Sequence, residues 1–144
     1  MLTFVRGAAT AAAMALTIIP ALAFEFEPGQ WEETENGTED GKPLPPNNST
    51  KRCINQADAA DASKALQVEA LKASSCQTAQ VDESGDTLTA KFRCKEGADG
   101  ITMDGTFKMA RKTYSAKVQM SMTMGGKTSS SDRTIEGKWL GACP

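Results

Sequence analysis

The chain has 144 residues, of which 40% are hydrophobic and 24% charged, and its formal net charge at neutral pH is -2. It contains no histidine, so the commonest general base and the commonest metal ligand of proteins are absent from the sequence. Its 16 basic residues do not exceed its 18 acidic ones and form no basic cluster, which argues against nucleic acid as a partner.

The first 23 residues have the pattern of a secretory signal peptide. Arg6 gives a positive start, residues 7–19 are apolar and rich in Ala, and Pro20 precedes the A-x-A cleavage signal Ala21-Leu22-Ala23. A transmembrane anchor is the alternative, but the apolar run is short for a hydrocarbon core of about 30 Å. We therefore expect cleavage after Ala23, which would leave no membrane span in the mature chain.

Removal of 23 residues from 144 would leave 121, the size of one domain, so residues 24–144 are expected to fold as a single unit. This part holds all the cysteines, and an even number of them in a small exported domain favours two disulfides. A metal site made of cysteines is the alternative, but the sequence has no C-x-x-C spacing. The cysteines are Cys53, Cys76, Cys94 and Cys143.

Two short strands and one helix are expected in the first half of the mature chain. The first strand lies around Trp31, and a loop follows at residues 36–48, where Gly, Pro, Asn and Asp are dense. The second strand lies near residues 49–54. Residues 55–74 then predict a single α-helix, with Asn55 as its N-cap and acidic residues in its first turns. Apolar residues repeat along it at three- and four-residue steps, which predicts a helix that covers a sheet.

From Cys76 onward, apolar and polar residues alternate, which is typical of antiparallel strands that are buried on one face. Three consecutive segments follow the pattern. Their apolar positions are Leu88, Ala90, Phe92 and Cys94; then Ile101, Met103, Phe107 and Met109; then Tyr114, Ala116, Val118, Met120, Met122 and Met124.

Turn residues indicate how these strands pair. A two-residue turn at Gly125-Gly126, which suits positive φ, sets Ala116 opposite Ile135. The same register sets Tyr114 opposite Gly137. A slip by one residue would bring charged residues of the last strand to the apolar face, which burial forbids.

Two further hairpins extend the same apolar face. The loop at residues 95–100 sets Phe92 opposite Met103. A turn at Ala110-Arg111 sets Met103 opposite Val118, although neither turn residue favours so tight a turn. The three registers together predict one continuous apolar face.

The hairpin that precedes them bears on the disulfides, for which three pairings are possible by count alone. A three-residue loop at Ser84-Gly85-Asp86 would place Cys76 directly opposite Cys94. We therefore predict the bridge Cys76–Cys94, which leaves Cys53 and Cys143 to tie the early strand to the C-terminus.

The ordered set of these features resembles the domain of unknown function 3617 (DUF3617) family, over essentially the whole mature chain. The family's members are small exported bacterial proteins, so the resemblance implies the periplasm of a Gram-negative bacterium. The family has no established activity, so the resemblance implies no catalytic or binding residue. The segment before the final Gly-x-Cys is often basic in the family, whereas here it reads Lys138-Trp139-Leu140. The residues that carry the resemblance are Pro28-Gly29-x-Trp31-Glu32, Cys53-Ile54-Asn55-Gln56-Ala57-Asp58, Cys76, Cys94, the Met/Thr-rich strand, and Trp139-Leu140-Gly141-Ala142-Cys143.

The segment Met120-Ser121-Met122-Thr123-Met124 places three thioethers on one side of a strand, and Met103 and Met109 add two more. Thioethers are soft ligands that suit Cu(I), so Met120, Met122 and Met124 are candidate metal ligands. Methionine is also a common filler of irregular cores, and the same residues then form the wall of a core or pocket.

An enzyme is not expected. Ser129-Ser130-Ser131-Asp132 lacks a histidine base, and the neighbouring carboxylates Glu32 and Glu33 point to opposite faces of a strand, so they cannot flank one bond.

The sequence as a whole predicts a mainly β fold: a curved antiparallel meander or partly closed barrel of about six to seven strands, with one packed helix and two disulfides. The expected role is non-enzymatic and needs no cofactor. The protein would bind a small apolar ligand or an envelope partner in the periplasm, and a periplasmic soft-metal (copper) binder is the alternative. The deciding question is whether the face that bears Val118 and Met122 is open or covered by the helix.

Overall fold

A computed structural model describes residues 24–46, 48–69 and 76–144. The expected signal peptide and the last part of the expected helix, residues 70–74, lie outside the described residues.

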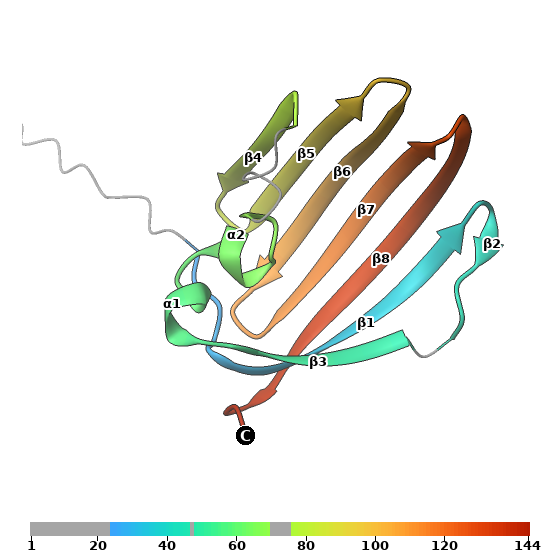
Figure 1. Ribbon diagram of the computed structural model, residues 1–144. Helices are drawn as coiled ribbons and strands as arrows, with labels where there is room; N and C mark the ends of the chain where they lie inside the picture. The colour runs from blue at the N-terminus through green and yellow to red at the C-terminus, as the bar shows by residue number, and fades with distance from the viewer. Residues whose placement is uncertain (1–23, 47, 70–75) are drawn as a thin grey trace, which may run out of the picture.

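The chain folds into one antiparallel sheet of eight strands, shown in Figure 1. Its order is β2-β1-β8-β7-β6-β5-β4, and β3 pairs with the same edge of β1 as β2 does. The prediction of a mainly β antiparallel meander is confirmed for β4 to β8, whereas the strand number is higher than expected and the sheet is open rather than partly closed. The strands are β1 (Gly29–Glu39), β2 (Lys42–Pro43), β3 (Asn48–Ile54), β4 (Thr78–Ser84), β5 (Thr87–Glu96), β6 (Asp99–Ala110), β7 (Thr113–Met124) and β8 (Lys127–Gly141).

Two of the predicted registers are confirmed. Tyr114 lies opposite Gly137 across β7 and β8, and Phe92 lies opposite Met103 across β5 and β6. The β7–β8 register follows from the turn at Gly125-Gly126, where φ is 56° and 77°. These angles are accessible to glycine without steric cost.

The predicted register of β6 and β7 is wrong by two residues. The turn occupies Arg111-Lys112, not Ala110-Arg111, so that Met103 lies opposite Met120 instead of Val118. Because side chains alternate with a period of two, this shift leaves every side chain on its predicted face.

The predicted disulfides are confirmed as Cys76–Cys94 and Cys53–Cys143, with Cα atoms 4.2 and 5.7 Å apart. The register that suggested the first of them is wrong by one residue, because the β4–β5 turn has two residues and pairs Ser84 with Thr87. Cys76 instead precedes the first residue of β4 and reaches Cys94 from outside the ladder.

β1 is longer than the sequence indicated. Residues 36–39, assigned to a loop on composition, continue the strand as far as Glu39, which lies opposite Ser131. The fifteen-residue β8 supplies backbone partners along the whole of β1, and this pairing outweighs the loop-forming composition.

The predicted single helix is divided into α1 (Gln56–Ala59) and α2 (Ala62–Ala65). Asn55 caps α1 as expected, accepting a hydrogen bond of 2.9 Å from the Asp58 backbone N–H. Asp61 caps α2 in the same way, accepting from the Lys64 N–H at 3.2 Å. An acid expected in an early turn of one helix therefore begins a second one. None of the described helices is long and apolar enough to cross a membrane.

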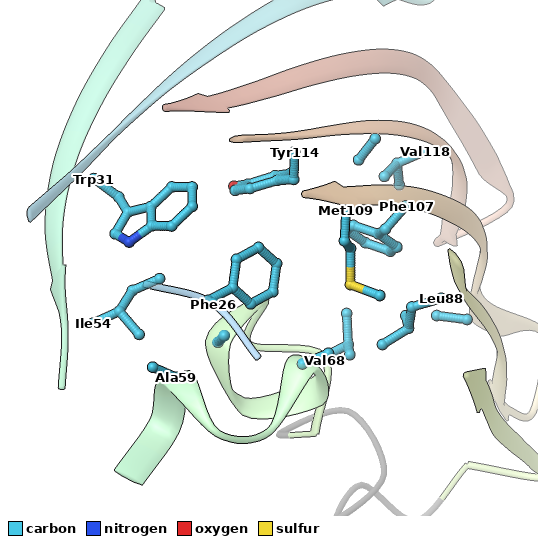
Figure 2. Close-up of a cluster of buried hydrophobic side chains, with 14 of the residues drawn as sticks. Phe26, Trp31, Ile54, Ala59, Val68, Leu88, Phe107, Met109, Tyr114 and Val118 are labelled. Carbon is cyan, nitrogen blue, oxygen red and sulfur yellow. The ribbon is translucent and has the colours of Figure 1, made fainter. Parts of the chain in front are cut away.

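The core lies between these helices and one face of the sheet, as Figure 2 shows. We call this face the inner face; it carries Leu88, Phe107 and Tyr114. Phe26, ahead of β1, lies at the centre of the cluster with its ring edge-on to Trp31 at a centroid distance of 5.3 Å. Its backbone N–H donates to the carbonyl of Ala59 in α1 at 2.9 Å, which ties the chain start to the helical layer. The buried apolar residues are Phe26, Trp31, Ile54, Ala59, Ala62, Ala65, Val68, Leu88, Ala90, Phe92, Phe107, Met109, Tyr114, Ala116 and Val118.

Gly137 leaves room for the ring of Tyr114, since a Cβ atom at this position would lie 2.0 Å from Tyr114 Cε1. We expect Gly137→Ala to destabilise the fold by about 1–3 kcal/mol, because the ring must move within a packed core. A double-mutant cycle with Tyr114→Ala, followed by chemical denaturation, measures the coupling. An equal cost of Gly137→Ala in both backgrounds would show that the ring is not the cause.

The two disulfides close loops of different length, with sequence separations of 90 and 18 residues. On the chain-entropy model, we expect replacement of Cys53 and Cys143 by Ala to cost about 4–5 kcal/mol, and replacement of Cys76 and Cys94 about 3 kcal/mol. Urea denaturation of the two double variants tests this order, and a reversed order would contradict it.

Candidate functional site

The inner face is covered at one end and open at the other. The helices cover the end near the β6–β7 turn, whereas the β5–β6, β7–β8 and β1–β2 turns lie at the opposite end, as Figure 1 shows. Exposure rises along β7 accordingly, from 9% at Val118 to 40% at Met122 and 62% at Met124. The sequence left undecided whether the helix covers the face that bears Val118 and Met122. In the structure Val118 is buried, whereas Met122 is exposed.

The open end of the inner face carries an apolar patch from β6 and β7. Met103 and Met120 lie directly opposite each other, as do Ile101 and Met122. Met103 also packs against the buried core, so the patch continues the core rather than standing apart from it. We define the apolar patch as Ile101, Met103, Met120, Met122 and Met124.

The border of the apolar patch differs on its two sides. Toward β8, Met120 lies opposite Ser131 and Met122 opposite Ser129, as the predicted register required. Toward β5, Met103 lies opposite the buried Phe92. An occupant of the patch would therefore meet hydroxyl groups on one side and apolar side chains on the other.

Two aspartates hold the turns around the open end. The carboxylate of Asp40 accepts from the Ser130 N–H at 2.7 Å and from the Ser129 hydroxyl at 3.0 Å, which fastens the β1–β2 turn to β8. The carboxylate of Asp99 accepts from the Gly125 N–H at 2.8 Å, which fastens the start of β6 to the β7–β8 turn.

Charged pairs occupy the part of the inner face formed by β1, β3 and β8. Arg52 Nε donates to Glu33 Oε1 at 2.6 Å, and Arg133 Nη1 donates to Glu35 Oε1 at 2.6 Å. The Tyr114 hydroxyl also donates to Glu33, and a second nitrogen of Arg52 donates to a backbone carbonyl of α2. Burial of these groups is therefore accompanied by charge pairing, as low-dielectric surroundings require.

A hollow of about 80 Å³ lies beside these pairs and is lined by Glu33, Glu35, Thr50 and Ile135. Larger hollows, of about 630, 510 and 470 Å³, lie on the outer face of the sheet. Polar side chains dominate the lining of the first of them, among them Thr89, Thr106, Lys117, Gln119 and Thr134.

The structure assigns the methionines singled out by the sequence to two different environments. Met120, Met122 and Met124 lie at the open end together with Met103, whereas Met109 is only 4% exposed and packs in the core. Glu32 and Glu33 do point to opposite faces, since Glu32 pairs with Lys51 and Glu33 with Arg52.

The inner-face ion pairs were missed by sequence reasoning, although a signal for one of them was present. The register that sets Tyr114 opposite Gly137 also sets Arg133 opposite Val118, an apolar position. A charged residue there requires a partner, and Glu35 lies at an inner-face position on the neighbouring strand β1.

Burial raises the pKa of Tyr114, and its hydrogen bond to Glu33 raises it further. Because the phenol has a higher pKa in the folded state than in the unfolded state, it contributes fully to folding stability while the pH is below the unfolded pKa of about 10. This contribution is lost as the pH rises above that value toward the folded pKa.

Tyr114 is the only tyrosine, so tyrosinate absorbance reports this phenol alone. We expect it to ionise only when alkali unfolds the protein, whereas in urea it should titrate near its ordinary pKa. Ionisation near pH 10 with the near-ultraviolet circular dichroism intact would contradict this assignment.

Comparisons with known proteins are informative about the family and not about the activity. No curated protein and no solved structure matches the chain. The model of the family described as proteins of unknown function (DUF3617) matches residues 26–143, from Phe26 in the core to the last cysteine. The chain therefore belongs to the DUF3617 family.

Proposed function

We propose that this protein is a non-enzymatic binding protein of the bacterial periplasm, which holds an apolar segment of another envelope protein on its apolar patch. The observation that carries the proposal is the clustering of exposed apolar side chains at the open end of the inner face. The large hydrophobic residues that are exposed in the described part of the chain are Ile101, Met122, Met124 and Leu140, and three of these four belong to the patch. A cluster of this kind on a water-soluble surface is typical of an interaction site.

The shape of the open end favours a protein segment over a small molecule. Pockets for small ligands usually measure about 300–1,000 Å³. The described hollow on the inner face measures about 80 Å³ and is lined by Glu33, Glu35, Thr50 and Ile135, none of which belongs to the apolar patch. The apolar patch is an open surface bordered by serines, so it can be covered by an extended or helical segment. The flexible methionine side chains can adapt to such a segment.

Two observations support the periplasm. The two disulfides are compatible with an oxidising compartment and would be unusual in the bacterial cytosol. The signal-peptide pattern of residues 1–23 is an expectation from the sequence that favours the same location, as does the export that the family resemblance implies.

The non-enzymatic assignment is supported by the state of the charged groups. The pKa of Tyr114 is raised by burial and by its hydrogen bond to Glu33, which takes this pKa further from neutrality. A general acid or base works best with a pKa near the operating pH. The inner-face carboxylates Glu33 and Glu35 are already paired with arginines.

Photocrosslinking in the exporting bacterium tests this proposal. A benzophenone amino acid at Met122 should give adducts with another exported protein, and fragment masses should place the crosslink in an apolar segment of that protein. The matched control is the same probe at Lys117, which is exposed on the outer face of the same strand, and it should give no such adduct. Adducts of equal yield at both positions, or a small-molecule adduct at Met122, would overturn the proposal.

A further inference from the structure

We propose that the apolar patch contains a binding site for a soft monovalent metal ion, Cu(I) or its analogue Ag(I), made by the thioethers of Met103, Met120 and Met122. This site goes beyond the proposed partner binding and does not depend on it. This ligand set differs from the one that the sequence suggested, which was Met120, Met122 and Met124. Met103 of the neighbouring strand β6 takes the place of Met124.

The positions of these methionines allow their sulfurs to converge. Met103 and Met120 are direct cross-strand partners, and such partners have Cβ atoms about 4.5–5.5 Å apart. Met122 follows Met120 on the same face, about 7 Å further along the strand. Each side chain is unbranched and has three rotatable bonds, so the three thioethers can reach one ion placed between them.

Met124 is less suitable as a ligand than Met103. It is the last residue of β7, is 62% exposed, and lies opposite the cationic Lys127. Met109 is excluded because it is buried in the core opposite Tyr114. The structure therefore selects three of the five methionines that the sequence offered.

The chemistry of the three ligands selects the class of ion. Thioethers are soft and neutral, so they favour Cu(I) and do not compensate the desolvation of a doubly charged ion. Harder metals find no competing site in the described residues, where no group of three or more His, Cys, Asp or Glu could hold an ion. Both cysteine pairs are oxidised, so no thiolate competes for the soft ion either.

The surroundings leave a path to the site. Met122 is 40% exposed, and the hydroxyls of Ser129 and Ser131 border the methionines on the β8 side. Two cations of the inner face flank the methionines on β8: Arg133, whose charge is compensated by Glu35 at 2.6 Å, and the exposed Lys127, which lies opposite Met124. On the core side of the site, a monovalent cation therefore meets a compensated charge, whereas Lys127 lies beyond Met122 at the rim of the open end.

Substitution of the methionines by leucine distinguishes metal binding from partner binding. Leucine nearly conserves the volume and the apolar character of methionine but removes the sulfur. Met103→Leu, Met120→Leu and Met122→Leu should therefore each weaken metal binding and leave the photocrosslinking yield from Ile101 unchanged. Failure of one proposal is thereby distinguishable from failure of the other.

The test is a Cu(I) titration of the disulfide-intact mature protein against a chromophoric Cu(I) chelator, without oxygen and with ascorbate as reductant. Native mass spectrometry with Ag(I) gives the stoichiometry. We expect one ion per chain and a loss of affinity of at least about tenfold for each leucine variant, the loss typical when even an outer partner of a metal site is removed. Uptake should persist at about pH 5, where an imidazole would be protonated, because a thioether carries no proton.

Two further variants complete the experiment. Met124→Leu is the matched control and should bind as the natural chain does. Ile101→Met adds a thioether directly opposite Met122 and should tighten binding, a gain that a folding defect cannot produce. Absence of uptake, uptake that survives all three leucine variants, or loss of uptake in Met124→Leu alone would overturn the proposal.

Discussion

A single sheet with one apolar face must cover that face with other parts of the same chain or leave some of it in contact with water. In the described residues, the covering layer consists of two four-residue helices, Val68 and the segment around Phe26. This layer is large enough for the end of the sheet that carries Trp31 and Tyr114, and it does not extend to Met122. The division of the inner face into a core and an exposed patch follows from this shortage of covering residues. The alternation of the strands continues beyond this layer, so Met122 and Met124 remain exposed on the inner face, past the end of the described cover.

The charged pairs also make the inner face differ from strand to strand, across the sheet. Glu33 joins β1, β3 and β7 through Arg52 and Tyr114, and Arg52 also reaches a carbonyl of α2. This network fixes the helical layer to β1 and β3 and to the covered end of β7. Beyond the covered end, the inner face is consequently polar where Glu35 pairs with Arg133 and apolar where β6 and β7 carry the patch.

Much of the fold could be predicted because period-two alternation fixes which face each residue occupies, and glycine turns fix the register. Gly125-Gly126 is strong turn chemistry, and the pairing it predicted is correct. Arg111-Lys112 has no residue that favours a tight turn. An error of two residues in this register leaves every side chain on the same face, so the apolar pattern cannot reveal it. The break between α1 and α2 was missed because Asp61 serves equally well within a first turn and as an N-cap. The extent of the cover could not be predicted, since it depends on where Phe26 and Val68 are placed by tertiary contacts. The candidate site was indicated only in part: the alternation places Met120, Met122 and Met124 on one face, whereas the pairing of Met103 with Met120 depends on the register that was wrong.

The bonds from Asp40 and Asp99 have a consequence for whatever occupies the open end. Hairpin tips ordinarily move on the nanosecond to microsecond scale, and a flexible rim must lose conformational entropy when a ligand or partner binds. Here the three hairpins that surround the apolar patch are fastened to one another by carboxylate-to-backbone hydrogen bonds of 2.7 and 2.8 Å. The rim is therefore preorganised, and the remaining adjustment on binding falls to the methionine side chains. A binding site with this fixed outline and deformable lining would discriminate among occupants by their outline more than by their detailed surface.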